Sequence, residues 1–193
     1  SGLSRAGYPT HDGGRAARVT FSDNPAEPLG AGGDAAVAID RIHTISRIVA
    51  CHQALGAMEV SLDATTSYLT SRKQFGVTLN KFQALTFRAA DMYVSLELAR
   101  SLTLWATLVL DSGHGDDTAE AAARASLQVS RAGRHIGQEA IQLHGGIGMT
   151  AEYAVGHYTS HLTALEHWLG DGRHHLAALS SRIGDHDGVD PLR

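Results

Sequence analysis

Residues 39–69 read IDRIHTISRIVACHQALGAMEVSLDATTSYL, and the spacing of the apolar residues in this stretch decides the fold class. The apolar residues recur at steps that fit the 3.6-residue period of an α-helix, not the alternation of a strand. They are Ile39, Ile42, Ile45, Val49, Leu55, Met58, Leu62 and Leu69. The pattern predicts one long helix that begins near Asp34 and ends at about Thr70.

A break at residues 74–79 separates this helix from a second one. Asn80 and Gln83 have the spacing of a capping box, in which two side chains bond the free N–H groups at a helix start. The sequence therefore predicts that the second helix begins there and ends before the segment Ser112–Gly115. Its apolar stripe consists of Phe82, Leu85, Ala89, Met92, Leu96, Ala99, Ala106 and Leu110.

A third helix is predicted from about Asp117 to Leu143. The glycine-rich segment His144–Gly148 follows it, and glycine is the residue that most often ends a helix. The predicted buried face of this helix is rich in alanine, which favours helix formation and lets neighbouring helices approach closely. That face consists of Ala121, Ala125, Ala132, Ile136 and Ala140.

The remaining sequence completes a bundle. Thr150 is predicted to cap a fourth helix that runs to about Trp168, and a shorter helix follows to about Ile183. Three long helices and a broken final one, joined by short turns, predict an all-α fold, an antiparallel four-helix bundle over residues 34–184. Residues 185–193 are predicted to form a flexible tail.

Residues 1–33 have a different composition, because they contain three of the four prolines and many glycines. Residues 15–21 are predicted to form a strand, bounded by turn residues on both sides. A single strand does not form a stable sheet. We therefore expect a short N-terminal β remnant whose partner strands lie in another part of the protein or in another subunit.

Composition narrows the classes of partner and compartment. The net charge of −4 and the absence of a basic stripe argue against nucleic acid as a main partner. Cys51 is the single cysteine, which is typical of a protein in a reducing compartment, and the sequence predicts a cytoplasmic protein. No uninterrupted apolar run is long enough to span a membrane, so a membrane is not expected as a partner.

Two motifs at the ends of long helices carry the chemistry. The first is Arg72-Lys-Gln-Phe-Gly76, followed by Phe82-Gln83, and the second is Gln142-Leu-His-Gly-Gly-Ile-Gly148. Together they closely resemble the acyl-CoA dehydrogenase family, and the resemblance extends over residues 34–183. Residues 12–30 are similar to the last strand of that family's middle β-domain, so residues 1–33 are interpreted as the tail of such a domain and a linker.

The resemblance implies that both motifs contact the FAD of a neighbouring subunit. The guanidinium of Arg72 offers paired donors that suit a pyrophosphate, although a helix-end charge that meets the helix dipole is a second interpretation. Gly145 and Gly146 end a helix, and their missing side chains also let a ligand approach the backbone. The cofactor-binding residues implied by the resemblance are Arg72, Phe75, Gln83, Gln142, Gly145 and Gly146.

The family's reaction removes an α-proton and a β-hydride from an acyl-CoA thioester, and its base is a glutamate. At the usual position of that glutamate this sequence has Leu169, and at the alternative position on the first helix it has Ser46. Neither side chain removes an α-proton as a carboxylate does. Glu166 precedes Leu169 by one helical turn and is the remaining, weaker candidate for the base.

A metal site is not predicted. His157 and His161 have a spacing that suits metal binding on a helix, but no third ligand accompanies them in a recognisable pattern. Solvent-facing histidines are the expected alternative. His174 and His175 likewise lack partners, and no glutamate in the sequence begins the Glu-x-x-His motif of di-iron bundles.

Three functional hypotheses remain open from the sequence. In the first, the chain belongs to a working acyl-CoA dehydrogenase that has FAD between its subunits and a base not yet identified. In the second, which we favour, it is the non-base partner of a heteromeric complex, as in similar actinobacterial proteins of sterol degradation. In the third, it is a structural or binding bundle that has lost flavin. The first two imply an oligomer and an acyl-CoA substrate.

Overall fold

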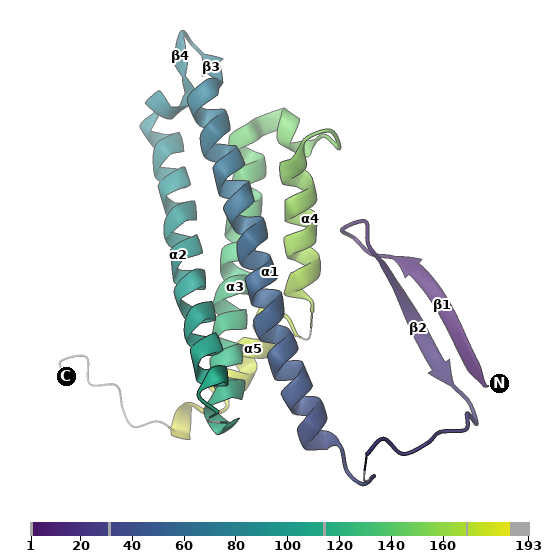
Figure 1. Cartoon of the computed structure of the whole chain (residues 1–193). Helices are drawn as coiled ribbons and strands as arrows, with labels where there is room; N and C mark the ends of the chain where they lie inside the picture. The colour runs from purple at the N-terminus through teal and green to yellow at the C-terminus, as the bar shows by residue number, and fades with distance from the viewer. Residues whose placement is uncertain (1, 31, 114, 169, 186–193) are drawn as a thin grey trace.

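The computed structural model describes residues 2–30, 32–113, 115–168 and 170–185. Four helices form an antiparallel bundle, a fifth short helix lies at one end of it, and a two-stranded hairpin stands beside it (Figure 1). The prediction of an all-α four-helix bundle with a β remnant is confirmed. The helices are α1 (Ala36–Ser71), α2 (Gln83–Asp111), α3 (Gly115–His144), α4 (Ala154–Glu166) and α5 (Gly172–Ser180).

Helix α3 is the centre of the bundle, because it packs against α1, α2, α4 and α5. Its predicted buried face is confirmed, since Ala121, Ala125, Ala132, Ile136 and Ala140 are all at most 2% exposed. The small side chains bring the helix backbones close together. At the crossing with α4, a Cβ added to Gly137 would lie 3.1 Å from Cγ2 of Thr159.

The predicted apolar stripe of α1 is only partly buried. Leu55, Met58 and Leu62 lie in the core, but Ile39 is 48% exposed and Val49 is 61% exposed. The helical period was correct, because these residues do lie on a helix. The period does not show whether another element of the same chain covers a given face, and residues 36–43 of α1 are exposed throughout.

The prediction that a capping box of Asn80 and Gln83 begins the second helix was wrong. Between α1 and α2 lie β3 (Lys73–Gln74), β4 (Val77–Thr78) and the 3₁₀ helix η1 (Leu79–Lys81). The residue that caps α2 is Phe82, and no side chain bonds its first N–H groups. Asn80 instead accepts a hydrogen bond from the hydroxyl of Thr78, with 2.6 Å between the two oxygens. The side chain of Asn80 therefore stabilises the β4–η1 turn and not the helix start.

The predicted start of the fourth helix was also too early. Thr150 follows the 3₁₀ helix η2 (Gly145–Met149), and its hydroxyl donates back to the carbonyl of Ile147 at 2.8 Å. Helix α4 begins at Ala154 after Tyr153. The glycine-rich stop thus continues as η2 before the chain turns. A further 3₁₀ helix, η3 (Ile183–Asp185), follows α5, and the predicted tail beyond it lies outside the described residues.

The N-terminal strand has a partner that the sequence did not reveal. β2 (Arg15–Phe21) has the predicted bounds, but β1 (Leu3–Pro9) pairs with it in antiparallel register from Leu3↔Phe21 to Pro9↔Arg15. The prediction that its partner must lie elsewhere was therefore wrong. A two-stranded hairpin is at best marginally stable in water. Both of its faces are largely exposed.

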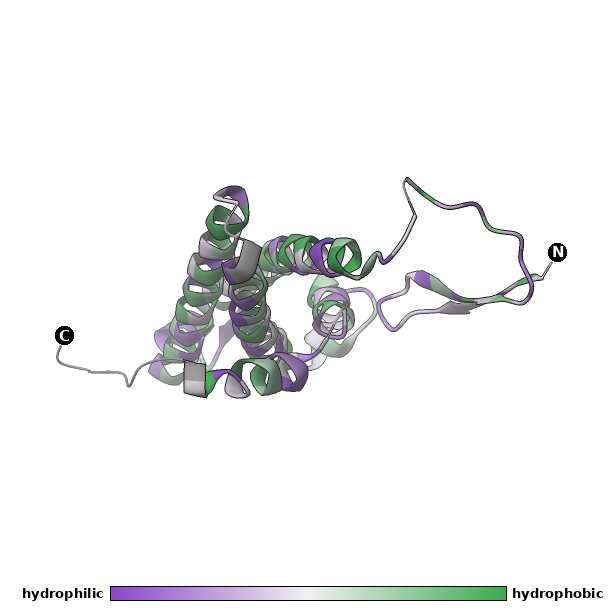
Figure 2. Ribbon diagram, turned by 90° about the horizontal axis from the view of Figure 1, so that it is seen from below, coloured by the Kyte–Doolittle hydropathy of each residue, from purple (hydrophilic) through white to green (hydrophobic). Residues whose placement is uncertain are grey.

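One side of α2 is apolar and exposed. Phe87, Val94, Leu98, Trp105 and Leu108 follow the helical period and are each 39–63% exposed; we call them the α2 outer face. In the end-on view of Figure 2, apolar residues lie around the helices as well as between them. Among the described residues, α2 is also the one helix long and apolar enough to cross a membrane, by length and composition alone. The absence of a membrane partner stays a prediction.

Candidate functional site

A groove of about 530 Å³ opens at the end of the bundle where α1 and α3 end and α2 begins. It is bordered by Arg72 from the end of α1 and by Gln142, Gly145 and Gly146 from the end of α3. The two motifs that lie far apart in the sequence therefore meet in space. Four of the six residues proposed to bind the cofactor line the groove.

The backbone around Arg72 is fixed although its side chain is exposed. Its N–H donates to the carbonyl of Tyr68 at 2.8 Å, and its carbonyl accepts from the N–H of Leu79 at 2.9 Å. The chain then turns through Phe75 and Gly76, both with positive φ (52° and 84°). These contacts hold the root of the Arg72 side chain at the rim of the groove.

Phe75 and Gln83 lie beside the groove without lining it. The ring of Phe75 stands at the tip of the β3–β4 turn, where it is 91% exposed and meets Phe82 edge-to-face at 6.2 Å between centroids. Gln83 is the first residue of α2 and is exposed. Within this chain the two side chains are therefore exposed beside the groove.

The three glycines after α3 differ in what a side chain at each position would meet. Gly145 has φ +65°, a left-handed conformation that side chains disfavour. A Cβ added to Gly146 would meet no atom within 4 Å, so the missing side chain leaves open space at the groove. A Cβ on Gly148 would lie 3.0 Å from the Ile141 carbonyl oxygen and 3.0 Å from Cβ of His144. Gly146 alone has no local structural requirement.

His144 holds this glycine turn against α1. Its Nδ1–H donates to the carbonyl of Ala140 at 2.7 Å. The ring lies between Tyr68 and Tyr153, at centroid distances of 4.6 and 4.9 Å. The imidazole is buried, so this stack joins the ends of α1 and α3 beneath the groove.

The charge of the groove is positive. Among the described residues that line it, Arg72 and Arg88 are charged and none is acidic. Nε and Nη2 of Arg88 donate to the carboxylate of Glu139 at 2.6 and 3.0 Å, and this pairing raises the pKa of Arg88. The α1 and α3 ends are helix C-termini, which carry partial negative charge. The arginines must therefore supply the attraction for an anion. Sequence reasoning missed Arg88.

A second pocket, of about 490 Å³, lies between the tip of the β1–β2 hairpin and the helices α1 and α4. We call it the hairpin pocket. Ser46, the alternative position of the family's base, lines it together with Trp168. Leu169, at the usual position, follows Trp168 in the chain but lies outside the described residues. The pocket therefore adjoins Ser46, one of the two positions at which a catalytic carboxylate was sought.

Asp12 is the one acidic residue among the described residues lining the hairpin pocket. Its carboxylate accepts from the Thr10 hydroxyl at 2.6 Å, from Nδ1 of His161 at 2.9 Å and from the Gly14 N–H at 3.3 Å. These bonds, that of Thr10 first, hold the pKa of Asp12 well below its usual range. A carboxylate so stabilised in its charged form is a weak base.

His161 is not the solvent-facing residue that the sequence suggested. Besides Asp12 it contacts Gln53, with 3.0 Å between the two Nε2 atoms, so it joins the hairpin tip to α4 and α1. His157 is exposed, as predicted, and its Nε2 bonds the carbonyl of Ala151 at 2.8 Å. Within the described ranges no three potential ligands are grouped to hold a metal ion.

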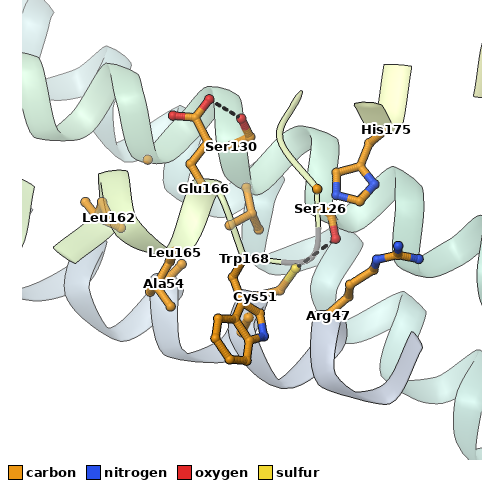
Figure 3. Close-up of a pocket in the computed structure, with 14 residues that line it drawn as sticks. Arg47, Cys51, Ala54, Ser126, Ser130, Leu162, Leu165, Glu166, Trp168 and His175 are labelled. Atoms are coloured by element: carbon orange, nitrogen blue, oxygen red, sulfur yellow. Dashed lines mark hydrogen bonds between the residues drawn. The ribbon is translucent and has the colours of Figure 1, made fainter. Parts of the chain in front are cut away.

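Glu166, the weak candidate for the base, is engaged elsewhere. Its Oε1 accepts from the Ser130 hydroxyl and from Nη2 of Arg134, both at 2.9 Å, so its carboxylate ties α4 to α3. The side chain is 11% exposed and lines a small cavity of about 30 Å³ (Figure 3). It does not line the hairpin pocket, whereas Trp168 borders both spaces.

The same cavity contains two buried groups that are neutral near pH 7. Burial raises the pKa of the Cys51 thiol to about 11, and its Sγ lies 3.6 Å from the Ser126 hydroxyl. Burial, and then the charge of Arg47, lowers the pKa of His175 to about 4. Figure 3 shows the Cys51 thiol and the His175 ring both lying beside the Ser126 side chain. His175 thus packs as a neutral core residue, and its packing neighbours were not expected from the sequence.

Comparison with known proteins places the chain in a family. The model of the acyl-CoA dehydrogenase C-terminal domain matches residues 35–184. A probable acyl-CoA dehydrogenase of Bacillus subtilis is 38% identical over 109 residues, which are 56% of this chain and 28% of that protein. An acyl-CoA dehydrogenase of Mycobacterium tuberculosis is 36% identical over 140 residues, which are 72% of this chain and 42% of that protein.

The fold of a solved relative agrees. A variant of the Tcur3481–Tcur3483 steroid ACAD superposes with a TM-score of 0.87 and 28% identity, covering 95% of this chain and 49% of that one. The chain spans less than half the length of the two curated relatives above. The match extends through α1 to α5 and includes both groove motifs. The chain belongs to the acyl-CoA dehydrogenase family and corresponds to its C-terminal helical domain.

Proposed function

We propose that this chain supplies the helical domain of an FAD-dependent acyl-CoA dehydrogenase and that its groove receives the pyrophosphate of a flavin bound by a neighbouring subunit. The observation that carries the proposal is the meeting of Arg72, Gln142, Gly145 and Gly146 at one positively charged groove. Family membership supports the reaction class. The flavin, when bound, supplies the redox chemistry that oxidises the α,β carbon–carbon bond of the acyl thioester.

The groove residues bind and orient. The fork of Arg72 donates paired hydrogen bonds to phosphate oxygens, a geometry that a guanidinium matches well. Gly146 lets the ligand lie against the backbone, because nothing fills the space where its Cβ would be. The amide of Gln142 donates to or accepts from the polar atoms beside the phosphates. Phe75, exposed at its turn, would be covered when the neighbouring subunit docks.

We further propose that the chain is the non-base partner of a heteromeric complex. Removal of an α-proton requires a carboxylate whose pKa is raised toward the working pH. The hairpin pocket has the hydroxyl of Ser46 at one base position, and Leu169 occupies the other. Asp12 is held in its charged form, and Glu166 is bound to Ser130 and Arg134.

Two further observations support assembly with another subunit. The α2 outer face exposes five large apolar side chains of the kind that partner subunits cover. The steroid ACAD that superposes on this chain is named for a pair of proteins.

The test is to co-express the chain with a partner subunit that carries the glutamate and to measure FAD per complex and enoyl-CoA formation. Arg72→Ala removes a charge-assisted contact of about 1.5–3 kcal/mol, which corresponds to roughly ten- to hundredfold weaker flavin binding. Lys73→Ala is the control, because it removes a neighbouring charge that does not line the groove. Unchanged flavin content in the Arg72 variant would contradict the proposal.

The same experiment separates the alternatives. A complex that never contains flavin would favour a structural bundle, a hypothesis motivated by the missing base. Enoyl-CoA formation by the chain without a partner, abolished by Glu166→Gln, would favour a self-sufficient enzyme in which Glu166 leaves Arg134 during the reaction. In the heteromeric proposal, the chain without a partner is inactive and Glu166→Gln leaves the activity of the complex unchanged.

A further inference from the structure

Arg88 lines the groove in a conformation that the fold fixes in advance. It lies in the second turn of α2, and its Nε and Nη2 both donate to the carboxylate of Glu139 on α3. The side chain is nevertheless 39% exposed. A guanidinium has five N–H groups, and the pair with Glu139 uses one edge of it. The N–H groups of Nη1 and the second one of Nη2 remain for a ligand.

Arg72 differs in this respect. Its side chain is exposed at the end of α1, and within the described part of the chain no carboxylate holds it. The groove thus has one exposed cation at the end of α1 and one cation on α2 that is oriented by a carboxylate. An arginine that is already ordered loses less conformational freedom when it binds a ligand. Arg88 is therefore suited to determine where an anion sits, and Arg72 is suited to close onto it.

The charges around the groove give these two residues distinct tasks. Glu139 compensates one positive charge, and two helix C-termini add partial negative charge. A single phosphate can be held by one guanidinium fork. A diphosphate has oxygens on two phosphorus atoms and carries more negative charge, so it can engage both arginines at once.

From this geometry we infer that Arg88, oriented by Glu139, is a second anion-binding residue of the groove and that the two arginines together select a diphosphate over a monophosphate. The inference rests on the proposed function, because it concerns the ligand of the same groove. Its new content is the role of Arg88, and of Glu139 in orienting it.

The test is calorimetric titration of the flavin-free complex with ADP and with AMP. The unmodified complex should bind ADP more tightly than AMP. Arg88→Met should weaken ADP binding about ten- to hundredfold while changing AMP binding much less, so that the preference is lost. Lys81→Met is the matched control, because it removes a cation from the same end of the bundle outside the groove. It should leave the preference unchanged.

Two further variants keep the result decisive. Arg88→Lys retains the charge opposite Glu139 but loses the fork, so it should reduce the preference even if the methionine variant does not fold. Glu139→Gln removes the charge that orients Arg88 and should weaken ADP binding less than Arg88→Met. Retention of the full ADP preference in the folded Arg88 variants would overturn the inference.

The outcomes also separate this inference from the proposed function. If ADP binds and Arg72→Ala weakens it while the Arg88 variants do not, the groove is a flavin site and the role assigned to Arg88 is wrong. If the unmodified complex binds neither nucleotide and loses no flavin in the Arg72 variant, the proposed function of the groove itself fails.

Discussion

A Cβ added at Gly148 tests the packing beneath the groove. It would lie 3.0 Å from the carbonyl oxygen of Ile141, 3.2 Å from Cα of Ile141 and 3.0 Å from Cβ of His144. The first two atoms belong to the backbone of α3 and cannot rotate away. His144 is itself held by its hydrogen bond to Ala140 and by its stack with Tyr68 and Tyr153. Gly148→Ala must therefore move either η2 or the end of α3.

Overpacking of this kind costs about 1–3 kcal/mol of unfolding free energy. For a chain of this size, one kcal/mol shifts the melting temperature by about 2–4 °C. We expect Gly148→Ala to lower the melting temperature by roughly 2–12 °C in thermal unfolding followed by circular dichroism. Gly146→Ala is the control, because its Cβ would meet nothing within 4 Å and its φ is not positive. It should melt at or slightly above the temperature of the parent protein.

Equal melting temperatures for the Gly148 variant and the parent would refute the packing argument. So would an equal loss in both variants, since the cost would then come from the glycine-rich sequence in general. Flavin content adds a second measurement on the same proteins. Gly146→Val should lower it without loss of stability, because it fills space at the groove and not in the core.

Three further predictions follow from the buried and paired groups. Because folding lowers the pKa of His175 from 6.5 to about 4, the unfolded chain binds the proton first as the pH falls. The contribution of His175 to the free energy of unfolding is therefore complete above pH 6.5 and is lost as the pH falls toward 4. In urea unfolding, the difference in unfolding free energy between pH 7.5 and pH 5 should be smaller for His175→Leu than for the parent protein. The Cys51 thiol, with its pKa raised to about 11, should react slowly with a thiol reagent at pH 8 in the native protein and rapidly in denaturant. Asp12→Asn removes the charged partner of His161 and should speed amide hydrogen exchange in β1 and β2 while the exchange of the bundle helices stays unchanged; equal exchange in the hairpin would show that this contact does not hold it.

The sequence predicted the helices well, because helix formation depends on local pattern. The end of α1 was expected at about Thr70 and lies at Ser71, and the end of α3 was expected at Leu143 and lies at His144. The pairing of strands and the burial of a helix face depend on residues that are distant in the sequence. β1 could not be recognised without its register on β2, and the exposure of Ile39 depends on what lies opposite its face.

The candidate site also has a part that the sequence predicts and a part that it does not. Arg72, Gln142 and the glycine turn stand at helix ends, where a break in the period marks them, and the family resemblance assigned their role. Arg88 lies inside a helix and is recognisable only through Glu139, 51 residues away. Similarly, His161 meets Asp12 across 149 residues. No spacing within a helix indicates such contacts. The pairing of Arg88 in the groove and the contact at the hairpin tip are therefore recognisable only in the three-dimensional structure.

In the proposed heteromeric complex, the α2 outer face would make the lifetime of this subunit depend on the abundance of its partner. Phe87, Leu98 and Trp105 are exposed on one side of a helix. A partner that covers them binds the folded subunit and not the unfolded one, so apparent stability rises with subunit concentration by mass action. A subunit made in excess keeps this stripe open to aggregation and to proteases. Balanced synthesis of the two chains, and not the intrinsic stability of the bundle alone, would then set how much of the protein a cell retains.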